Sequence, residues 1–244
     1  MRFFITFSYD GARYHGWQVQ PNAVSVQGVI NEALSTLLRS DVKTTGAGRT
    51  DTGVNAKKMV AHFDTNVEFD SDLLVKKLNR ILPPDISIQN IRRVADNCHS
   101  RFDAKFRTYH YYVHTRKNPF YRHYAMSLHY EPDYVMMNLA AQQLLGMHDF
   151  TSFSKLHTDV KTNFCNVISA QWVNIEDDLW RFEITADRFL RNMVRAIVGT
   201  LLEVGRMKIT IEDFKKIIET KDRCAAGDSV PGHALTFVDV VYEY

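Results

Sequence analysis

The order of strand and helix patterns is the feature that most constrains how this chain can fold. In the first part, alternating β-branched and aromatic residues predict strands, and apolar residues spaced three and four apart predict helices. The predicted strands are 2–9, 41–46, 59–64 and 86–94, and the predicted helices are 25–38, which Ser25 caps, and 71–82. This strand-helix-strand-strand-helix-strand order is that of the split βαβ unit in ferredoxin-like folds.

The second part predicts the same order with one added helix. Strands are expected over 105–115, 163–175, 179–185 and 235–242, and helices from Asp133 through Leu145, over 188–205 and over 211–219. The two halves share a predicted topology, with no obvious repeat of letters. We therefore expect an α/β (α+β) protein of two ferredoxin-like β-α-β-β-α-β domains, residues 1–103 and 104–244, with antiparallel or mixed sheets forming a central cleft.

Composition narrows the class of protein only moderately. An apolar content of 45% over 244 residues can bury a proper core, and a net charge of +2 neither requires nor excludes a polyanionic partner. The three cysteines are far apart and form no C-x-x-C pair. Residues 2–7 read as a strand and not as a signal peptide, and no apolar run reaches membrane-spanning length. A cytoplasmic protein without membrane contact is expected.

Residues 46–56 have the composition of a functional site. Three glycines, an arginine and one carboxylate stand there without an apolar period. Glycines permit a tight turn that aims Asp51 outward, and Arg49, two residues earlier, shares its face in an extended chain. A neighbouring guanidinium lowers the pKa of a carboxylate, so Asp51 is a candidate nucleophile, general base or metal ligand. A structural turn with a satisfied aspartate is the alternative.

Two familiar motifs do not fit this stretch. A dinucleotide loop requires a third glycine where Asp51 stands, and that carboxylate repels a pyrophosphate. Asp51-Thr52-Gly53 has the letters of an aspartic protease, but that chemistry needs two such aspartates, and Asp228-Ser229-Val230 lacks the glycine.

Arginines recur in the predicted helix 188–205. Arg188, Arg191 and Arg195 follow three- and four-residue spacing and predict one basic stripe, which Arg206 extends. A solvated helix face is the alternative for Arg188 and Arg191. Arg195 lies in the apolar run 193–198, where a buried arginine needs an anionic partner, and Asp51 is the partner we expect.

Cations and aromatic rings also alternate around the strand 105–115. The cationic and histidine residues are Arg101, Lys105, Arg107, His110, Arg116 and Lys117, and the rings between them are Tyr109, Tyr111 and Tyr112. Such interleaving suits phosphate contacts and base stacking, although a half-buried strand often looks the same. Period-two alternation places Arg107, Tyr109 and Tyr111 on one face.

Two other groups of residues give weaker signals. The loop 9–21 mixes aromatic and polar residues that can stack on bases, but a packed surface loop is the simpler interpretation. The histidines 62, 99, 148, 157 and 233 have no metal-ligand spacing, so no metal is expected.

Several stretches together resemble the TruA-type tRNA pseudouridine synthases. They are Tyr9-Asp10-Gly11, Tyr14-His15-Gly16-Trp17-Gln18, residues 48–54, Leu82-Pro83-Pro84-Asp85-Ile86, Arg107-Thr108-Tyr109 with Tyr111-Tyr112, His148-Asp149-Phe150, and residues 193–199 around Arg195. They occur in the family's order and span nearly the whole chain, and the combination is highly specific.

The resemblance implies a cofactor-free and metal-free homodimer that converts uridine to pseudouridine in the anticodon arm of tRNA, typically at positions 38 to 40. By matching motif, Asp51 resembles the catalytic nucleophile, Tyr109 the active-site tyrosine and Arg195 the residue that pairs with the aspartate. Arg49 resembles the arginine of the same loop, and Leu235 the apolar contact with the uracil ring. Arg107, Arg188 and Arg191 remain candidates for contacts with the RNA.

The chain also departs from the family's pattern. Asn55 stands where the family usually has histidine, and Ala234-Leu235-Thr236-Phe237 is looser than the usual Gly-Leu-Tyr-Leu. The rival hypothesis is an RNA-binding module without catalysis. Such a module has no reason to assemble Asp51, Tyr109 and Arg195.

Overall fold

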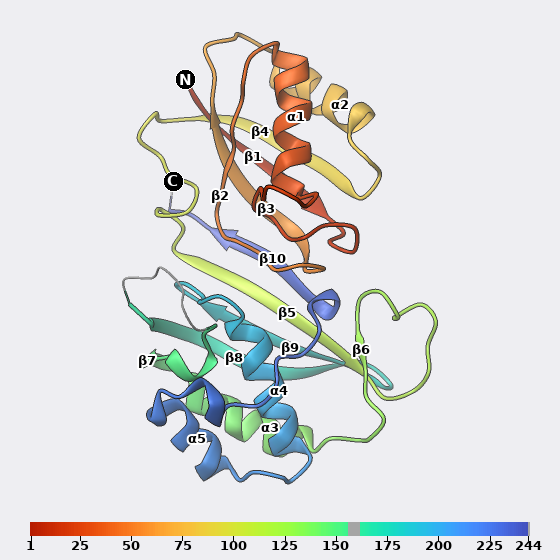
Figure 1. The fold of residues 1–244 in the computed structure, drawn as a ribbon, viewed down its shortest axis with the longest axis vertical. Helices are drawn as coiled ribbons and strands as arrows, with labels where there is room; N and C mark the ends of the chain where they lie inside the picture. Colours follow the sequence, from red (N-terminus) through yellow and green to blue (C-terminus); the bar gives the residue numbers. More distant parts are fainter. Residues whose placement is uncertain (156–161, 244) are drawn as a thin grey trace. The chain divides into compact units, whose positions relative to one another are not determined.

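The structure is a computed structural model that describes residues 1–155 and 162–243, so His157 lies outside the described residues. The chain divides into two compact units, which are considered separately. The first comprises Met1–Lys105 and Thr236–Tyr244, and the second Phe106–Leu235. Helices and strands occur in both, and the predicted mixed α/β class is confirmed (Figure 1).

The first unit contains a sheet in the strand order β4-β1-β3-β10, with β2 paired to β3. Its elements are β1 (Arg2–Tyr9), α1 (Val26–Leu38), β2 (Thr45–Gly46), β3 (Asn55–Asp64), α2 (Ser71–Ile81), β4 (Ile86–Val94) and β10 (Leu235–Val241). β1 is antiparallel to both β3 and β4, while β10 runs parallel to β3 with Thr236 opposite Asn55. Up to β4, the element order is the predicted β-α-β-β-α-β.

The predicted strand 41–46 is wrong for its first four residues. Only Thr45 and Gly46 pair with β3. The N–H of Val42 donates to the Ser35 hydroxyl (2.9 Å) and that of Thr44 to the Asn31 side chain (3.0 Å). Because side chains of α1 take these backbone groups, they are not available to a strand ladder.

The second unit contains an antiparallel sheet in the order β5-β9-β8-β7, with the short β6 parallel to β5. Its strands are β5 (Phe106–His114), β6 (Met126–Ser127), β7 (Gly146–Asp149), β8 (Phe164–Glu176) and β9 (Leu179–Ala186). Its α-helices are α3 (Tyr134–Ala141), α4 (Met193–Gly205) and α5 (Ile211–Thr220), and they contact one another. The helix that Asp133 caps ends four residues earlier than predicted and continues as a 3-10 turn, Gln142–Leu144.

The helix α4 begins at Met193, so the predicted helix start at Arg188 is wrong. The backbone before it makes other hydrogen bonds. The Asp187 side chain accepts the N–H groups of Asn166 and Arg188, and the Arg191 carbonyl accepts the N–H of Lys155. Asn192 then adopts φ +68°, a left-handed conformation that asparagine tolerates and that interrupts a helix. The predicted arginine stripe on one helix therefore does not exist.

The last strand, β10, is grouped with the first unit, whereas the sequence placed residues 235–242 in the second domain. One reason that β10 belongs to the first unit is its pairing with β3. The C-terminal residues also contact the 100–105 segment: the Val241 carbonyl accepts the N–H of Lys105 (2.9 Å), and the Tyr242 hydroxyl donates to the Ser100 carbonyl (2.6 Å). The division into two independent ferredoxin-like domains at residue 103 stays a prediction.

Candidate active site

In the first unit, Asp51 lies in a turn that joins β2 to β3. The N–H of Val54 donates to the Asp51 carbonyl at 3.2 Å and closes the turn. Gly53, the third residue of the turn, has φ +76°, which favours glycine because other residues rarely adopt it. The predicted glycine-bounded turn around Asp51 is therefore confirmed.

Thr50 fixes the direction of the residues on either side of it. It is buried, its hydroxyl is hydrogen-bonded to that of Tyr9 at 2.8 Å, and its carbonyl accepts the N–H of Trp17 at 3.2 Å. Arg49 is exposed and Asp51 is half-buried. Since successive residues of an extended chain face opposite ways, anchoring Thr50 inward leaves Arg49 and Asp51 on the outward side.

The aromatic loop before α1 supports this turn from within the first unit. Tyr14 and Trp17 are buried. The Tyr14 hydroxyl donates to Asp85 at 2.6 Å, and the Trp17 ring stacks on Phe7 with centroids 5.2 Å apart. For these two rings the packed-loop interpretation is correct. Their contribution is to position the Asp51 turn.

Two glycines of that loop pack directly against the turn. A Cβ on Gly16, whose φ is +89°, would lie 2.3 Å from the Thr50 carbonyl oxygen, and one on Gly11 would lie 2.2 Å from the Val54 carbonyl oxygen. The Gly11 N–H donates to the Asn55 side-chain oxygen at 2.8 Å. Sequence reasoning placed these glycines in the family motifs but did not predict that they carry the turn.

In the second unit, Tyr109 stands near the start of β5, opposite Ile184 of β9. Tyr109 and Tyr111 are buried, whereas His110 and Tyr112 between and beyond them are partly exposed, so the predicted alternation is confirmed. The Tyr109 ring meets the Phe189 ring edge-on, at 5.0 Å and 85°. Phe189 is a neighbour of Tyr109 that the sequence did not single out, although its place beside Arg188 was a signal.

The segment between β9 and α4 brings several candidate residues close to Tyr109. Arg107, on the same strand face as Tyr109, donates a hydrogen bond to the Asp187 carbonyl. Arg188 and Phe189 follow directly, and Arg191 is exposed two residues later. The contacts from β5 therefore hold this segment as an irregular loop. RNA contacts by Arg107, Arg188 and Arg191 remain predictions.

Arg195 lies in the first turn of α4 and is half-buried. Its Nε donates to the Val230 carbonyl at 2.7 Å, and the Val230 N–H donates back to the Arg195 carbonyl at 3.3 Å. A backbone carbonyl is thus one partner of this arginine. The predicted partner, Asp51, belongs to the other unit, and their pairing stays a prediction.

Tyr111 and Arg195 together hold the segment that leads to Leu235. The Tyr111 hydroxyl donates to the Pro231 carbonyl at 3.0 Å, next to the Val230 carbonyl that Arg195 binds. A 3-10 turn, Gly232–Ala234, follows, and Leu235 after it is 5% exposed. Burial raises the pKa of Tyr111 and the Arg195 charge lowers it only in part, so the hydroxyl stays protonated and able to donate.

Within 1–155 and 162–243, no group of three or more histidine, cysteine or acidic side chains is placed to bind a metal ion. In the same ranges, no helix has the length and apolar content needed to cross a membrane. The three cysteines are free thiols.

Comparison with known proteins gives consistent results. A family described as tRNA pseudouridine synthase matches residues 140–243. Curated proteins named tRNA pseudouridine synthase A match nearly the whole chain. The protein from Bacteroides thetaiotaomicron is 58% identical over 243 residues, covering 99% of this chain and 90% of its own length. That from Bacteroides fragilis is 56% identical over 242 residues (99% and 96%), and that from Bacillus subtilis 40% over 247 residues (100% of both).

Proposed function

The chain belongs to the tRNA pseudouridine synthase A family, and from this premise we propose that it isomerises uridine in the anticodon arm of tRNA, typically at positions 38 to 40, with Asp51 as nucleophile. Its class, an isomerase acting on tRNA, follows from the family. The main structural evidence for Asp51 as nucleophile is the way in which Thr50, the residue before it, is held in place. A buried threonine bonded through both its hydroxyl and its carbonyl fixes the adjacent carboxylate without enclosing it.

The reaction requires only rearrangement of bonds. The N1–C1′ bond breaks, the base turns, a C5–C1′ bond forms, the C5 proton leaves and N1 gains a proton. Nothing is oxidised or reduced, so one ionised carboxylate suffices as a covalent catalyst. Attack by Asp51 at C1′ displaces the base, and attack on the base forms a covalent adduct. Both alternatives require the target nucleotide to be flipped out of its stack, at a cost of a few kcal/mol.

The other site residues have roles that their surroundings support. Tyr109 stacks on the uracil ring and takes up the C5 proton in the last step, with the Phe189 ring packed nearly perpendicular to it. In this proposal Arg195 pairs with Asp51, as the resemblance implies, and Leu235 contacts the uracil. Arg49, Arg107, Arg188 and Arg191 bind RNA phosphates. Tyr111 holds the Pro231 carbonyl, and so positions the segment that carries Leu235 and that Arg195 also binds.

Replacement of Asp51 tests the nucleophile. The Asp51→Asn variant should lose turnover and keep tRNA binding, because the amide is isosteric but cannot form the covalent bond. Release of tritium from 5-tritiated uridine in tRNA measures turnover. Asp41→Asn is the matched control, since Asp41 is an exposed aspartate of the same unit that pairs with Lys43. Wild-type tritium release by Asp51→Asn would refute the assignment.

The sites of modification and the quaternary structure are tested separately. Mapping pseudouridines in tRNA from cells that lack the protein should show the loss of modification at positions 38 to 40. The resemblance also supports a cytoplasmic homodimer. Light scattering that gave a monomer mass for the fully active protein would remove the dimer from the proposal.

A further inference from the structure

The loop between β5 and β6, residues 115–125, presents aromatic side chains that do not contribute to the core. Figure 1 shows it extending beyond the ends of both strands within the second unit. Phe120 is 84% exposed, and Tyr124 is half exposed. A phenylalanine ring this exposed gives little stability to the folded protein, since apolar side chains stabilise in proportion to the surface that they bury.

Neighbouring residues fix the loop on both sides of Phe120. The Tyr121 hydroxyl donates to Glu176 at 2.8 Å, and its ring meets the His114 ring edge-on at 5.6 Å. The N–H of Phe120 donates to the Asn118 side chain at 2.9 Å. The anchoring of Tyr121 and Asn118 therefore holds the Phe120 ring outward in an ordered turn. Hydrogen bonding to Glu176 raises the pKa of Tyr121, so this anchor persists at neutral pH.

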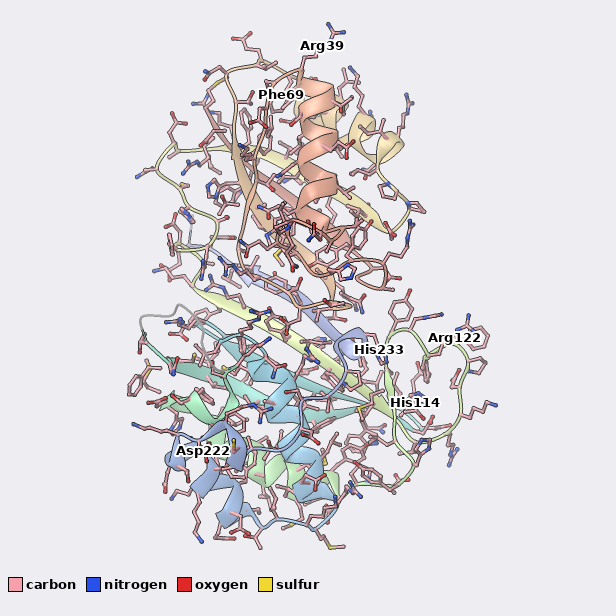
Figure 2. All side chains as sticks on the ribbon, viewed as in Figure 1. Arg39, Phe69, His114, Arg122, Asp222 and His233 are labelled. Atoms are coloured by element: carbon pink, nitrogen blue, oxygen red, sulfur yellow. The ribbon has the colours of Figure 1, made fainter. Side chains whose placement is uncertain are left out.

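The surroundings of the Phe120 ring are basic. Arg116, Lys117 and Arg122 are exposed, and residues 115–130 contain no aspartate or glutamate. Figure 2 shows Arg122 on the outer side of the loop. Three acidic side chains, those of Glu176, Asp177 and Asp178, also lie close enough to the loop to act on the Tyr121 hydroxyl.

Those acidic groups come from the turn between β8 and β9. Glu176 binds the Tyr121 hydroxyl, and Asp178 accepts the N–H of Arg116 at 2.8 Å. Both carboxylates are therefore paired with groups of the loop. An exposed ring with cations on both sides and polar neighbours fits a nucleic acid, which offers flat bases joined by phosphates.

We propose that the β5–β6 loop is a tRNA-binding element, in which Phe120 stacks on an unpaired base of the substrate and Lys117 and Arg122 bind the flanking phosphates. The proposal rests on the proposed function for the identity of the RNA. It adds a contact outside the set of residues assigned to the reaction. It makes the loop a determinant of which tRNAs are bound, because only an accessible base can stack on the ring.

Fluorescence and binding measurements on two variants test the stacking. Phe120→Ala should weaken tRNA binding roughly 5- to 150-fold, the range expected for loss of one base–aromatic stack. Phe120→Trp should restore binding, and saturating unmodified tRNA should protect its new fluorophore from acrylamide. Of the three native tryptophans, Trp17 and Trp172 are buried and Trp180 is partly exposed, so the quenching of the wild-type protein, with and without tRNA, is subtracted. Both variants should fold normally, because the ring they replace is exposed.

Controls separate a stack from other uses of an exposed side chain. Val135→Ala removes an apolar side chain of similar exposure, 72%, from α3 and should leave tRNA binding unchanged. Arg122→Gln should lower the slope of log affinity against log salt by about one, as expected for one lost phosphate contact.

Three results would overturn the proposal. The first is wild-type tRNA affinity in Phe120→Ala. The second is weaker binding of Phe120→Ala without acrylamide protection in Phe120→Trp, because the effect would then be indirect. The third is a change of molecular mass by light scattering with unchanged tRNA affinity, which would assign the ring to a contact between copies of the chain. Protection by tRNA in a protein that forms no pseudouridine would refute the proposed function alone, and normal pseudouridine formation without protection would refute only the role of Phe120.

Discussion

Substitution of Gly16 by alanine should strongly lower the activity of this protein while leaving it folded. Gly16 packs against the carbonyl of Thr50, and Asp51 is the next residue. An added Cβ would lie 2.3 Å from that oxygen, whereas contacts of this kind are essentially never shorter than 3.0 Å. The Thr50 carbonyl must therefore retreat by at least the difference, 0.7 Å, and the Asp51 backbone must follow.

The expected magnitudes come from that displacement and from the backbone conformation. A misplacement of about 1 Å in a catalytic group can cost roughly 100-fold in rate, so kcat/KM should fall by about that factor. Alanine at a φ of +89° costs about 1–2 kcal/mol, and weakening the bond from the Trp17 N–H to Thr50 adds about 1 kcal/mol. We expect the free energy of unfolding to fall by about 2–3 kcal/mol, with the protein still folded.

Gly146→Ala is the matched control for the backbone cost. Gly146 has nearly the same φ, +94°, but the nearest atom that a Cβ there would meet outside the adjacent residues is the His148 Nε2, at 3.9 Å, an ordinary contact. It should lose a similar 1–2 kcal/mol in urea unfolding and keep wild-type tritium release. Tritium release by Gly16→Ala within threefold of wild type would show that the position of the Thr50–Asp51 backbone does not limit catalysis, and the reasoning would fail.

Two further predictions concern buried polar side chains. Tyr111→Phe leaves the Pro231 carbonyl without this donor. The free energy of unfolding in urea should therefore fall by about 1–2 kcal/mol, and tritium release should show a several-fold lower kcat/KM. Unchanged values would remove Tyr111 as a positioning residue. Burial, aided by the Arg2 charge, lowers the pKa of His62 to about 4, whereas its unfolded value is near 6.5. Between these pH values the unfolded state binds more protons than the folded state. The free energy of unfolding must therefore fall as the pH drops from about 6.5 to about 4. Urea unfolding at pH 7 and pH 5 should differ by roughly 2 kcal/mol from this group, and less in His62→Gln; an equal difference in both proteins would contradict the assignment.

Local patterns predicted most helices and strands because the signals that define them are local. Ser25 and Asp70 cap α1 and α2 through their own side chains, and the alternation along β5 follows from the strand period. The predictions were wrong where residues distant in the sequence bind the backbone N–H and carbonyl groups. Arginines at helical spacing suggested that α4 begins at Arg188, but Asp187 and Lys155 occupy the backbone groups that a helix needs.

The same limit applies to the site, and Asn55 shows it most clearly. The sequence identified Asp51 and Arg49 from composition, and it identified Asn55 only as a departure from the family's usual histidine. In the structure, the Asn55 oxygen accepts the Gly11 N–H while Gly11 lies against the Val54 carbonyl. A neutral imidazole nitrogen can accept the same hydrogen bond. Asn55 therefore supplies the acceptor for this backbone group, a role that its place in the sequence did not indicate.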